Sequence, residues 1–258
     1  MDDVLERIDR FCDTVPRAWA SATDIGPLRL FTRNGKGWPF YARPVPGGGP
    51  ITMADVQRVR ERQRELGVSE AFEWVYAVAP SMADAAEAAG LEALVCPIMV
   101  LDGIPKSPDL PRGYTARLLG PADGDLGAAV HTLNSVAAAA FGAPPPGAPT
   151  EADLTVLRTD LAEGRLAKAL ICGPNGAVAA GSAQRSGDVV EVAGIGTAIA
   201  ERGIGLGGAI TALLAGAATR AGAELTFLSA GSDAATRVYQ RVGFRKVGEC
   251  AVAEPAAS

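Results

Sequence analysis

Hydrophobic residues in the first hundred positions follow helical spacing in some segments and strand-like runs in others. Val4, Leu5, Ile8, Phe11 and Cys12 lie at helical spacing, which predicts an amphipathic helix at the start of the chain. The further elements predicted up to residue 102 are a hairpin of LRLFTR and WPFYARPV around the turn NGKG, a helix carrying Val56, Val59 and Leu66, a strand at 71–76, a short helix that ends at Gly90, and the extended segment LEALVCPIMVLD.

A stretch with three prolines, GIPKSPDLPRG at 103–113, interrupts the pattern and is predicted to be a linker between two domains. After it we expect a strand at 114–119, helices around 123–140 and 150–163, the strands LAKALIC, AVAAGSAQ and DVVEVAGIGTAI, a helix after the turn ERGIGLGG, the strand ELTFLS, the helix SDAATRVYQRV, and a final strand or hairpin in GFRKVGECAVA. The turns GPNG and RSGD, which join the three central strands, are typical of hairpins. The sheet is therefore predicted to be antiparallel in this region.

Composition and charge exclude several classes of protein. The chain has 258 residues, of which 48% are hydrophobic and 21% are charged, so a largely disordered chain is excluded. The net charge of −5 disfavours a nucleic-acid partner. No apolar run approaches the roughly 18–20 residues of a membrane span, and the acidic N-terminus is unlike a secretory signal.

The cysteines and the histidine restrict the chemistry further. Cys12, Cys96, Cys172 and Cys250 lie far apart without a CxxC pair, which is typical of free thiols in a reducing compartment and predicts a cytoplasmic protein. The single histidine, His131, excludes a mechanism or metal site that needs two histidines from one chain. We therefore expect no metal.

The most informative segment is the glycine-rich turn Arg202-Gly203-Ile204-Gly205-Leu206-Gly207-Gly208, between a predicted strand and a predicted helix. Glycines let the backbone approach a ligand without Cβ clashes, and a helix N-terminus offers unpaired N–H groups with a partial positive charge. Arg202 adds a full charge, so the turn predicts a phosphate site. The alternative is a tight turn that binds no ligand.

Two kinds of phosphate-binding loop fit this turn. Gly203, Gly205 and Gly208 satisfy G-x-G-x-x-G, but a dinucleotide-binding loop opens a run of parallel strands, whereas antiparallel hairpins precede this one. Arg202-x-x-Gly205-x-Gly207 also satisfies [QR]-x-x-G-x-[GA]. With the second motif, which contains Asp233, Tyr239 and Gly243-Phe244, residues 114–258 resemble the GNAT family of acyl-CoA-dependent N-acetyltransferases.

The resemblance implies an α/β (α+β) fold with a mixed, mainly antiparallel sheet flanked by helices, and acetyl-CoA as the co-substrate. It implies that the strand before the turn splays from its neighbour to admit the pantetheine arm, which main-chain groups near Gly196, Thr197 and Ala198 would bind. The amides of the turn from Gly203 to Gly208, including those of Ile204 and Leu206, would hold the pyrophosphate. Asp233 stands where the family more often has asparagine, which leaves that contact open.

The two halves of the chain align when the first is shifted by 153 residues. FEWVY at 72–76 then falls on LTFLS at 225–229, Gly90-Leu91 on Gly243-Phe244, and Thr52 on Gly205. We predict a degenerate GNAT-like domain at 1–102, with its repeat in 25–102, then the linker at 103–113 and a catalytic domain at 114–258. The alternative is chance agreement between two α/β segments. The first copy lacks counterparts of Arg202, Gly205 and Gly207 and is not expected to bind CoA.

Two residues are candidates for proton transfer. An amine with a pKa near 10.4 must lose a proton before it attacks, and Glu191 is on the strand where some GNAT members carry a glutamate base. Tyr239 is where the family places the acid that protonates the leaving thiolate, whereas main-chain N–H groups of the splayed strand would meet the oxyanion. The alternatives are a solvent-facing strand carboxylate and a packed helix tyrosine. Glu201 is expected to be an exposed turn residue, Cys172 and Cys250 to be core residues, and His131 a partly buried helix residue.

The sequence thus predicts an N-acetyltransferase that moves an acetyl group from acetyl-CoA to a primary amine of a small molecule or peptide, by direct attack in a ternary complex. The alternative is a non-catalytic acyl-CoA-binding sensor or interaction module, and a nucleotide-dependent oxidoreductase ranks third. The acidic balance favours a cationic acceptor, whose identity the sequence does not give. No nucleic-acid or membrane partner is expected, and the oligomeric state is open, a homodimer included.

Overall fold

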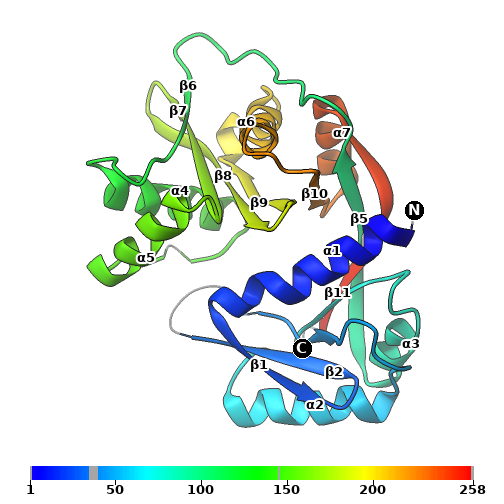
Figure 1. Cartoon of the computed structure of the whole chain (residues 1–258). Helices are drawn as coiled ribbons and strands as arrows, with labels where there is room; N and C mark the ends of the chain where they lie inside the picture. The colour runs from blue at the N-terminus through cyan, green and yellow to red at the C-terminus, as the bar shows by residue number, and fades with distance from the viewer. Residues whose placement is uncertain (1, 35–39, 145, 257–258) are drawn as a thin grey trace. The chain divides into compact units, whose positions relative to one another are not determined.

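The structure is a computed structural model that describes residues 2–34, 40–144 and 146–256, and the chain divides into two compact units (Figure 1). Unit 1 comprises Met1–Ile98, Ser229–Gly231 and Lys246–Ser258, and unit 2 comprises Met99–Leu228 and Ser232–Arg245. In the described part of the chain, no helix is both long and apolar enough to cross a membrane.

Unit 1 contains most of the elements predicted for the first hundred residues. They are α1 (Asp2–Thr14), the 3-10 helix η1 (Val15–Ala18), β1 (Ala20–Ile25), β2 (Leu28–Arg33), β3 (Arg43–Pro44), α2 (Met53–Leu66), β4 (Phe72–Val75), α3 (Ser81–Ala88) and the larger part of β5 (Leu91–Leu101). The opening helix, the strand in 71–76 and the helix before Gly90 are confirmed.

The predicted hairpin is only partly correct. The segment LRLFTR is β2, but its main partner among the described residues is β1, and β3 pairs with it there at two positions. The hydrophobic pattern does not predict β1, because ASATDI carries few apolar side chains and most of its residues are exposed. Residues 35–39, which hold part of the predicted turn and second strand, lie outside the described residues.

The end of the chain completes the core of unit 1. Strand β11 (Phe244–Pro255) pairs antiparallel with β4, from Cys250 opposite Val75 to Ala253 opposite Phe72. Ala253 and Phe72 are fully buried, in a cluster that also includes residues of β2, α2 and α3. The last strand of the predicted catalytic domain therefore contributes to the other compact unit.

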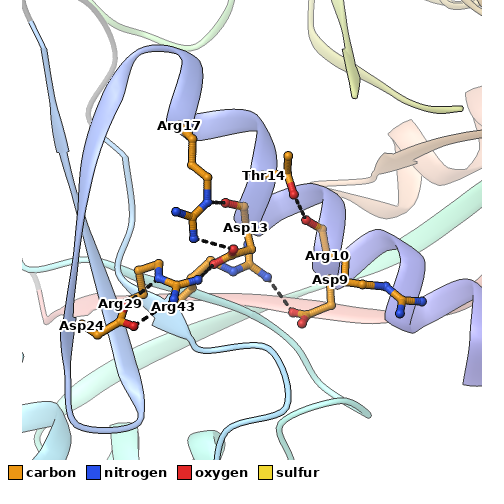
Figure 2. A network of polar contacts seen from close by, with 8 residues as sticks. All are labelled: Asp9, Arg10, Asp13, Thr14, Arg17, Asp24, Arg29 and Arg43. Carbon is orange, nitrogen blue, oxygen red and sulfur yellow. Dashed lines mark hydrogen bonds and ion pairs between the residues drawn. The ribbon is translucent and has the colours of Figure 1, made fainter. Parts of the chain in front are cut away.

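Arginine–aspartate pairs fix α1 to the strands of unit 1 (Figure 2). Arg43 of β3 and Asp9 of α1 form an ion pair of 2.6 Å in which the side chains are 3% and 5% exposed. Arg29 of β2 binds both Asp13 of α1 and Asp24 of β1, each at 2.6 Å. Removing one partner of a buried pair costs about 3–5 kcal/mol, because the other charge is left without a partner. The network therefore holds α1 in one position on these strands.

Unit 2 has a mixed sheet that is mainly antiparallel. Its elements are β6 (Thr115–Leu118), α4 (Leu126–Ala140), α5 (Glu151–Ala162), β7 (Leu166–Gly173), β8 (Gly176–Ser186), β9 (Val189–Thr197), η2 (Ile199–Glu201), α6 (Leu206–Arg220), β10 (Leu225–Ser229) except its last residue, α7 (Asp233–Val242) and the beginning of β11. The strands follow the order β10-β9-β8-β7-β6, in which only β10 is parallel to its neighbour. The predicted hairpins β7–β8 and β8–β9 are confirmed.

Helices cover both faces of this sheet. Ala180 of β8 belongs to a buried cluster with residues of α4 and α5. The next residue, Gly181, faces α6, because a Cβ there would lie 2.6 Å from Ile210 and 3.0 Å from Leu214. Since successive strand residues point to opposite faces, α4 and α6 lie on opposite sides of β8, as Figure 1 also shows.

The two halves follow the same order of elements, β3-α2-β4-α3-β5 and β9-α6-β10-α7-β11. Thr52 and Gly205, which the shift of 153 residues aligns, are the N-cap residues of α2 and α6. Residues 103–113 contain neither helix nor strand and belong to unit 2. The division into domains at 1–102 and 114–258 stays a prediction.

Candidate functional site

An open cleft of about 810 Å³ lies in unit 2 around the glycine-rich turn. The turn, the end of β9, helix α7 and residues 106–108 line it. It brings together most of the residues predicted from the sequence, which are Gly196, Thr197, Arg202, Gly203, Gly205, Leu206, Gly207, Gly208 and Tyr239.

The turn leaves the N-terminus of α6 open. Gly203 and Gly205 have φ angles of +87° and +93°, which side-chain-bearing residues rarely adopt. Gly205 is the N-cap residue and has no side chain to accept from the first N–H groups of α6. In α2, by contrast, Thr52 and Asp55 form a capping box that satisfies the corresponding groups. Of these two helix starts, that of α6 is the one suited to bind an anion.

Gly207 is glycine for a different reason. It lies in the first turn of α6 without a positive φ. Outside the backbone of its own helix, the one contact that a Cβ there would make with the described residues is to the Thr197 hydroxyl oxygen, at 3.7 Å. The backbone and the neighbouring atoms therefore tolerate a side chain at Gly207. Because Gly207 lines the cleft, that side chain would occupy space beside the helix N-terminus.

Strands β9 and β10 separate before either ends. Their pairing runs from Val189 opposite Leu225 to Glu191 opposite Phe227, whereas β9 continues to Thr197. Beyond Glu191, the described pairing of β9 is with β8 alone. Main-chain groups on the other edge of β9 therefore face the opening, where Ile195, Gly196 and Thr197 line the cleft.

A bulge in β9 changes which side chains share a face. The register between β8 and β9 shifts between Ala180 and Ser182, and Gly194 has a φ of +63°. Glu191 and Gly196 are five residues apart and would point to opposite faces of a regular strand. The extra residue puts both on the face covered by α4, where a Cβ on Gly196 would lie 2.9 Å from Ala140.

Glu191 is half-buried and occupies the last position at which β9 pairs with β10, where the two strands begin to separate. It does not line the cleft among the residues described there. Gln184 lies opposite it on β8, and the next position on the same face holds Ser182 and Lys168, whose hydroxyl and ammonium groups lie 3.2 Å apart. Burial lowers the pKa of Lys168. The face around Glu191 is therefore polar and suited to a polar acceptor.

Tyr239 extends from α7 into the lining of the cleft, with its ring centroid 6.4 Å from that of Phe244. Burial raises the pKa of the Tyr239 hydroxyl above its ordinary value near 10. The phenol therefore stays protonated at neutral pH, as a proton donor must.

Positive charge dominates the cleft of a protein whose net charge is −5. Its charged lining residues are Glu201 and four cations, namely Lys106, Arg202, Arg237 and Arg241. Arg202 donates from Nε to the Thr197 carbonyl oxygen at 3.2 Å and from a terminal nitrogen to that of Ala140 at 3.0 Å. These contacts place its guanidinium beside the end of β9.

Glu201 differs from our expectation of an exposed turn residue. It is half-buried, lines the cleft and accepts a hydrogen bond from the Tyr114 hydroxyl at 2.7 Å. This bond raises the pKa of Tyr114. The sequence pattern missed the contact because 87 residues separate the two partners.

Several candidates lie outside the described lining, namely Ala198, Ile204 and Asp233. Asp233 is exposed at the start of α7, and the preceding Ser232 caps that helix and lines the cleft instead. His131 lies on α4, also outside the lining. Among the described residues, no three His, Cys, Asp or Glu side chains are grouped as metal ligands.

Sequence reasoning missed other lining residues, namely Lys106, Ser107, Pro108, Ala140, Phe141, Arg237 and Arg241. Arg237 and Arg241 are four residues apart within the second motif, and this spacing on one helix face was a usable signal. No such sequence signal marks Lys106, because its position depends on how residues 103–108 pack on α6 and its turn.

No protein-family model and no curated protein sequence matches the chain. It is similar to the solved structure of a GCN5-related N-acetyltransferase from Kribbella flavida, with 23% identity, a TM-score of 0.77, and coverage of 99% of this chain and 96% of the other. A GCN5-related N-acetyltransferase-like protein from Streptococcus suis gives 14% identity, a TM-score of 0.60, and coverage of 98% and 99%. The structure of a tandem GNAT protein from the clavulanic acid biosynthesis pathway, without AcCoA, gives 18% identity, a TM-score of 0.52, and coverage of 90% of this chain and 79% of the other. The chain therefore has the GNAT fold that the two motifs predicted.

Proposed function

We propose that the chain is an acetyl-CoA-dependent N-acetyltransferase whose site is the cleft of unit 2 and whose acceptor is a primary amine of a small molecule or peptide. One observation carries the proposal. An uncapped helix N-terminus and four cations share a cleft that opens onto the split between β9 and β10.

The groups that line the cleft fit the parts of acetyl-CoA. Its phosphates need cations and N–H donors, which Arg202 and the amides from Gly203 to Gly208 supply. Its pantetheine amides need main-chain partners, and the edge of β9 near Gly196 and Thr197 offers them. Bound there, acetyl-CoA supplies an acetyl thioester. Solved structures described as N-acetyltransferases share the fold.

Two residues would carry the protons of the reaction. Glu191 takes a proton from the acceptor's ammonium group through water, because Glu191 does not line the cleft itself. The neutral nitrogen then bonds to the acetyl carbon, and main-chain N–H groups of β9 stabilise the oxyanion. As the carbon–sulfur bond breaks, Tyr239 gives its proton to the sulfur, which leaves as the free thiol. The nitrogen loses its second proton through water to the Tyr239 phenolate, which restores the acid, and Glu191 releases its proton to solvent.

A thiol-release assay tests this function against a non-catalytic acyl-CoA-binding module. We expect the chain to release CoA thiol from acetyl-CoA with at least one amine in a panel of diamines, basic peptides and neutral amines. Mass spectrometry should find one acetylated amine for each thiol released. The panel begins with cationic amines because the chain is acidic. Binding of acetyl-CoA without thiol release above the buffer rate, for every amine, would support the module instead.

A further inference from the structure

The cations of the cleft belong to two groups. Arg202 is bound to the end of β9 and to the last residue of α4. Arg237 and Arg241 lie on α7, and Lys106 lies on the segment that contacts the end of this helix. Among the described residues, none of these three cations has a carboxylate at ion-pair distance.

The backbone of Lys106 is fixed at the C-terminal end of α7. Its N–H donates to the Val242 carbonyl oxygen at 2.8 Å, and the N–H of Asp102 donates to that of Gly243 at 3.0 Å. These bonds satisfy carbonyl groups that a helix end otherwise leaves without partners.

Two prolines on either side of Lys106 pack on glycines of α6 and its turn. Pro108 lies where a Cβ on Gly205 or Gly208 would contact it, at 3.6 Å and 3.4 Å, and Pro105 lies 3.7 Å from a Cβ built on Gly216. Because proline fixes φ, this segment loses little conformational freedom when it packs. The structure thus holds Lys106 at the wall of the cleft.

Arg237 and Arg241 are four residues apart on α7, so their side chains share one helix face. Like charges at this spacing repel each other, and a third cation at Lys106 adds to the repulsion. A bound anion would relieve this repulsion. The diphosphate already has partners at the glycine turn, so these cations are suited to a separate phosphate group.

We infer that Lys106, together with Arg237 and Arg241, binds the 3′-phosphate of CoA, so that residues 103–108 form part of the cofactor site. The inference rests on the proposed function. A phosphomonoester carries a charge of about −1.5 to −2 at pH 7, and dephospho-CoA lacks it. The chain should therefore bind CoA more tightly than dephospho-CoA.

Titration of both ligands into the full chain tests the inference. At low salt, we expect wild type to prefer CoA over dephospho-CoA by at least tenfold. Lys106→Met should weaken CoA binding about fivefold and change dephospho-CoA binding less than twofold, because it removes one solvent-exposed charge contact. Lys106→Met combined with Arg241→Met should remove most of the preference, and the preference of wild type should shrink as salt rises.

Two variants serve as controls. Lys246→Met removes a lysine charge outside the cleft, where Lys246 is paired with Glu249 at 2.6 Å, and should change neither affinity. Arg202→Met should weaken the binding of CoA and of dephospho-CoA by the same factor, because Arg202 is assigned to the diphosphate that both ligands carry.

The outcomes separate this inference from the proposed function. If Lys106→Met weakens both ligands equally, or neither, the 3′-phosphate assignment is wrong while CoA binding stands. The assignment is equally wrong if wild type binds the two ligands alike. If wild type binds neither ligand, the proposed function and this inference both fail.

Discussion

Glu191→Gln is expected to lower kcat/KM for acetyl transfer by about 10²- to 10⁴-fold and to leave acetyl-CoA affinity unchanged. Glutamine keeps the shape of the side chain but cannot take a proton from the acceptor. Glu191 lies at the last position where β9 pairs with β10, and it is outside the described lining of the cleft, so its substitution should leave the contacts with acetyl-CoA intact. Steady-state kinetics with the amine found by the thiol-release assay, and titration with acetyl-CoA, provide the two readouts.

The pH profile distinguishes a base from a residue that only supports the strand. The deficit of Glu191→Gln should shrink at high pH, because more of an acceptor with a pKa near 10.4 is already neutral there. Glu151→Gln is the matched control, since Glu151 is an exposed residue of α5, and it should keep wild-type rates. Wild-type rates for Glu191→Gln on the acid side of the profile would assign the base to another group.

Tyr239→Phe should lower kcat/KM by a similar factor, about 10²- to 10⁴-fold, because the leaving thiolate loses its proton donor. The raised pKa of Tyr239, caused by burial, keeps the phenol protonated over the neutral range. The deficit should therefore persist across neutral pH, unlike that of Glu191→Gln. It should shrink with an acyl donor whose thiol has a lower pKa and leaves without help.

Tyr76→Phe is the control for this substitution. Tyr76 packs beside Trp74 in unit 1, with ring centroids 6.1 Å apart, and the loss of its hydroxyl should not change the rate. If the deficit of Tyr239→Phe is the same for good and poor leaving thiols, Tyr239 is not the acid.

The glycine turn illustrates what the sequence could predict. Its glycines, Arg202 and the helix that follows are contiguous in the chain, so local rules for turns and helix N-termini placed them correctly. The helices α6 and α7 were predictable from helical spacing, which is also a pattern of neighbouring residues. The turns GPNG and RSGD likewise predicted the hairpins β7–β8 and β8–β9.

Features that depend on contacts between distant residues were not predictable in this way. The bulge at Gly194 places Glu191 and Gly196 on the same face of β9. A single glycine in a strand sequence does not specify the register of that strand. Glu201 owes its partial burial to a partner 87 residues away. Residues 103–113 have the composition of a linker, and packing on the glycines of α6 brings Lys106 to the cleft.

The central claim is that one cleft in the chain binds acetyl-CoA, and that it does so at the N-terminus of α6. Calorimetric titration of the full chain with acetyl-CoA tests this most directly, with Gly207→Val and Gly124→Val titrated in parallel. Valine at 207 meets little steric opposition from the protein but fills space beside the uncapped amides. Gly124 is exposed and outside the described lining, and a Cβ there would meet no atom of the described residues within 4 Å.

We predict one site per chain, because the capping box of Thr52 and Asp55 closes the helix start that corresponds to Gly205. Gly207→Val should weaken binding at least tenfold, about 1.4 kcal/mol, with the fold retained, and Gly124→Val should bind as wild type does. Two sites per chain, or an unchanged affinity for Gly207→Val, would contradict the claim.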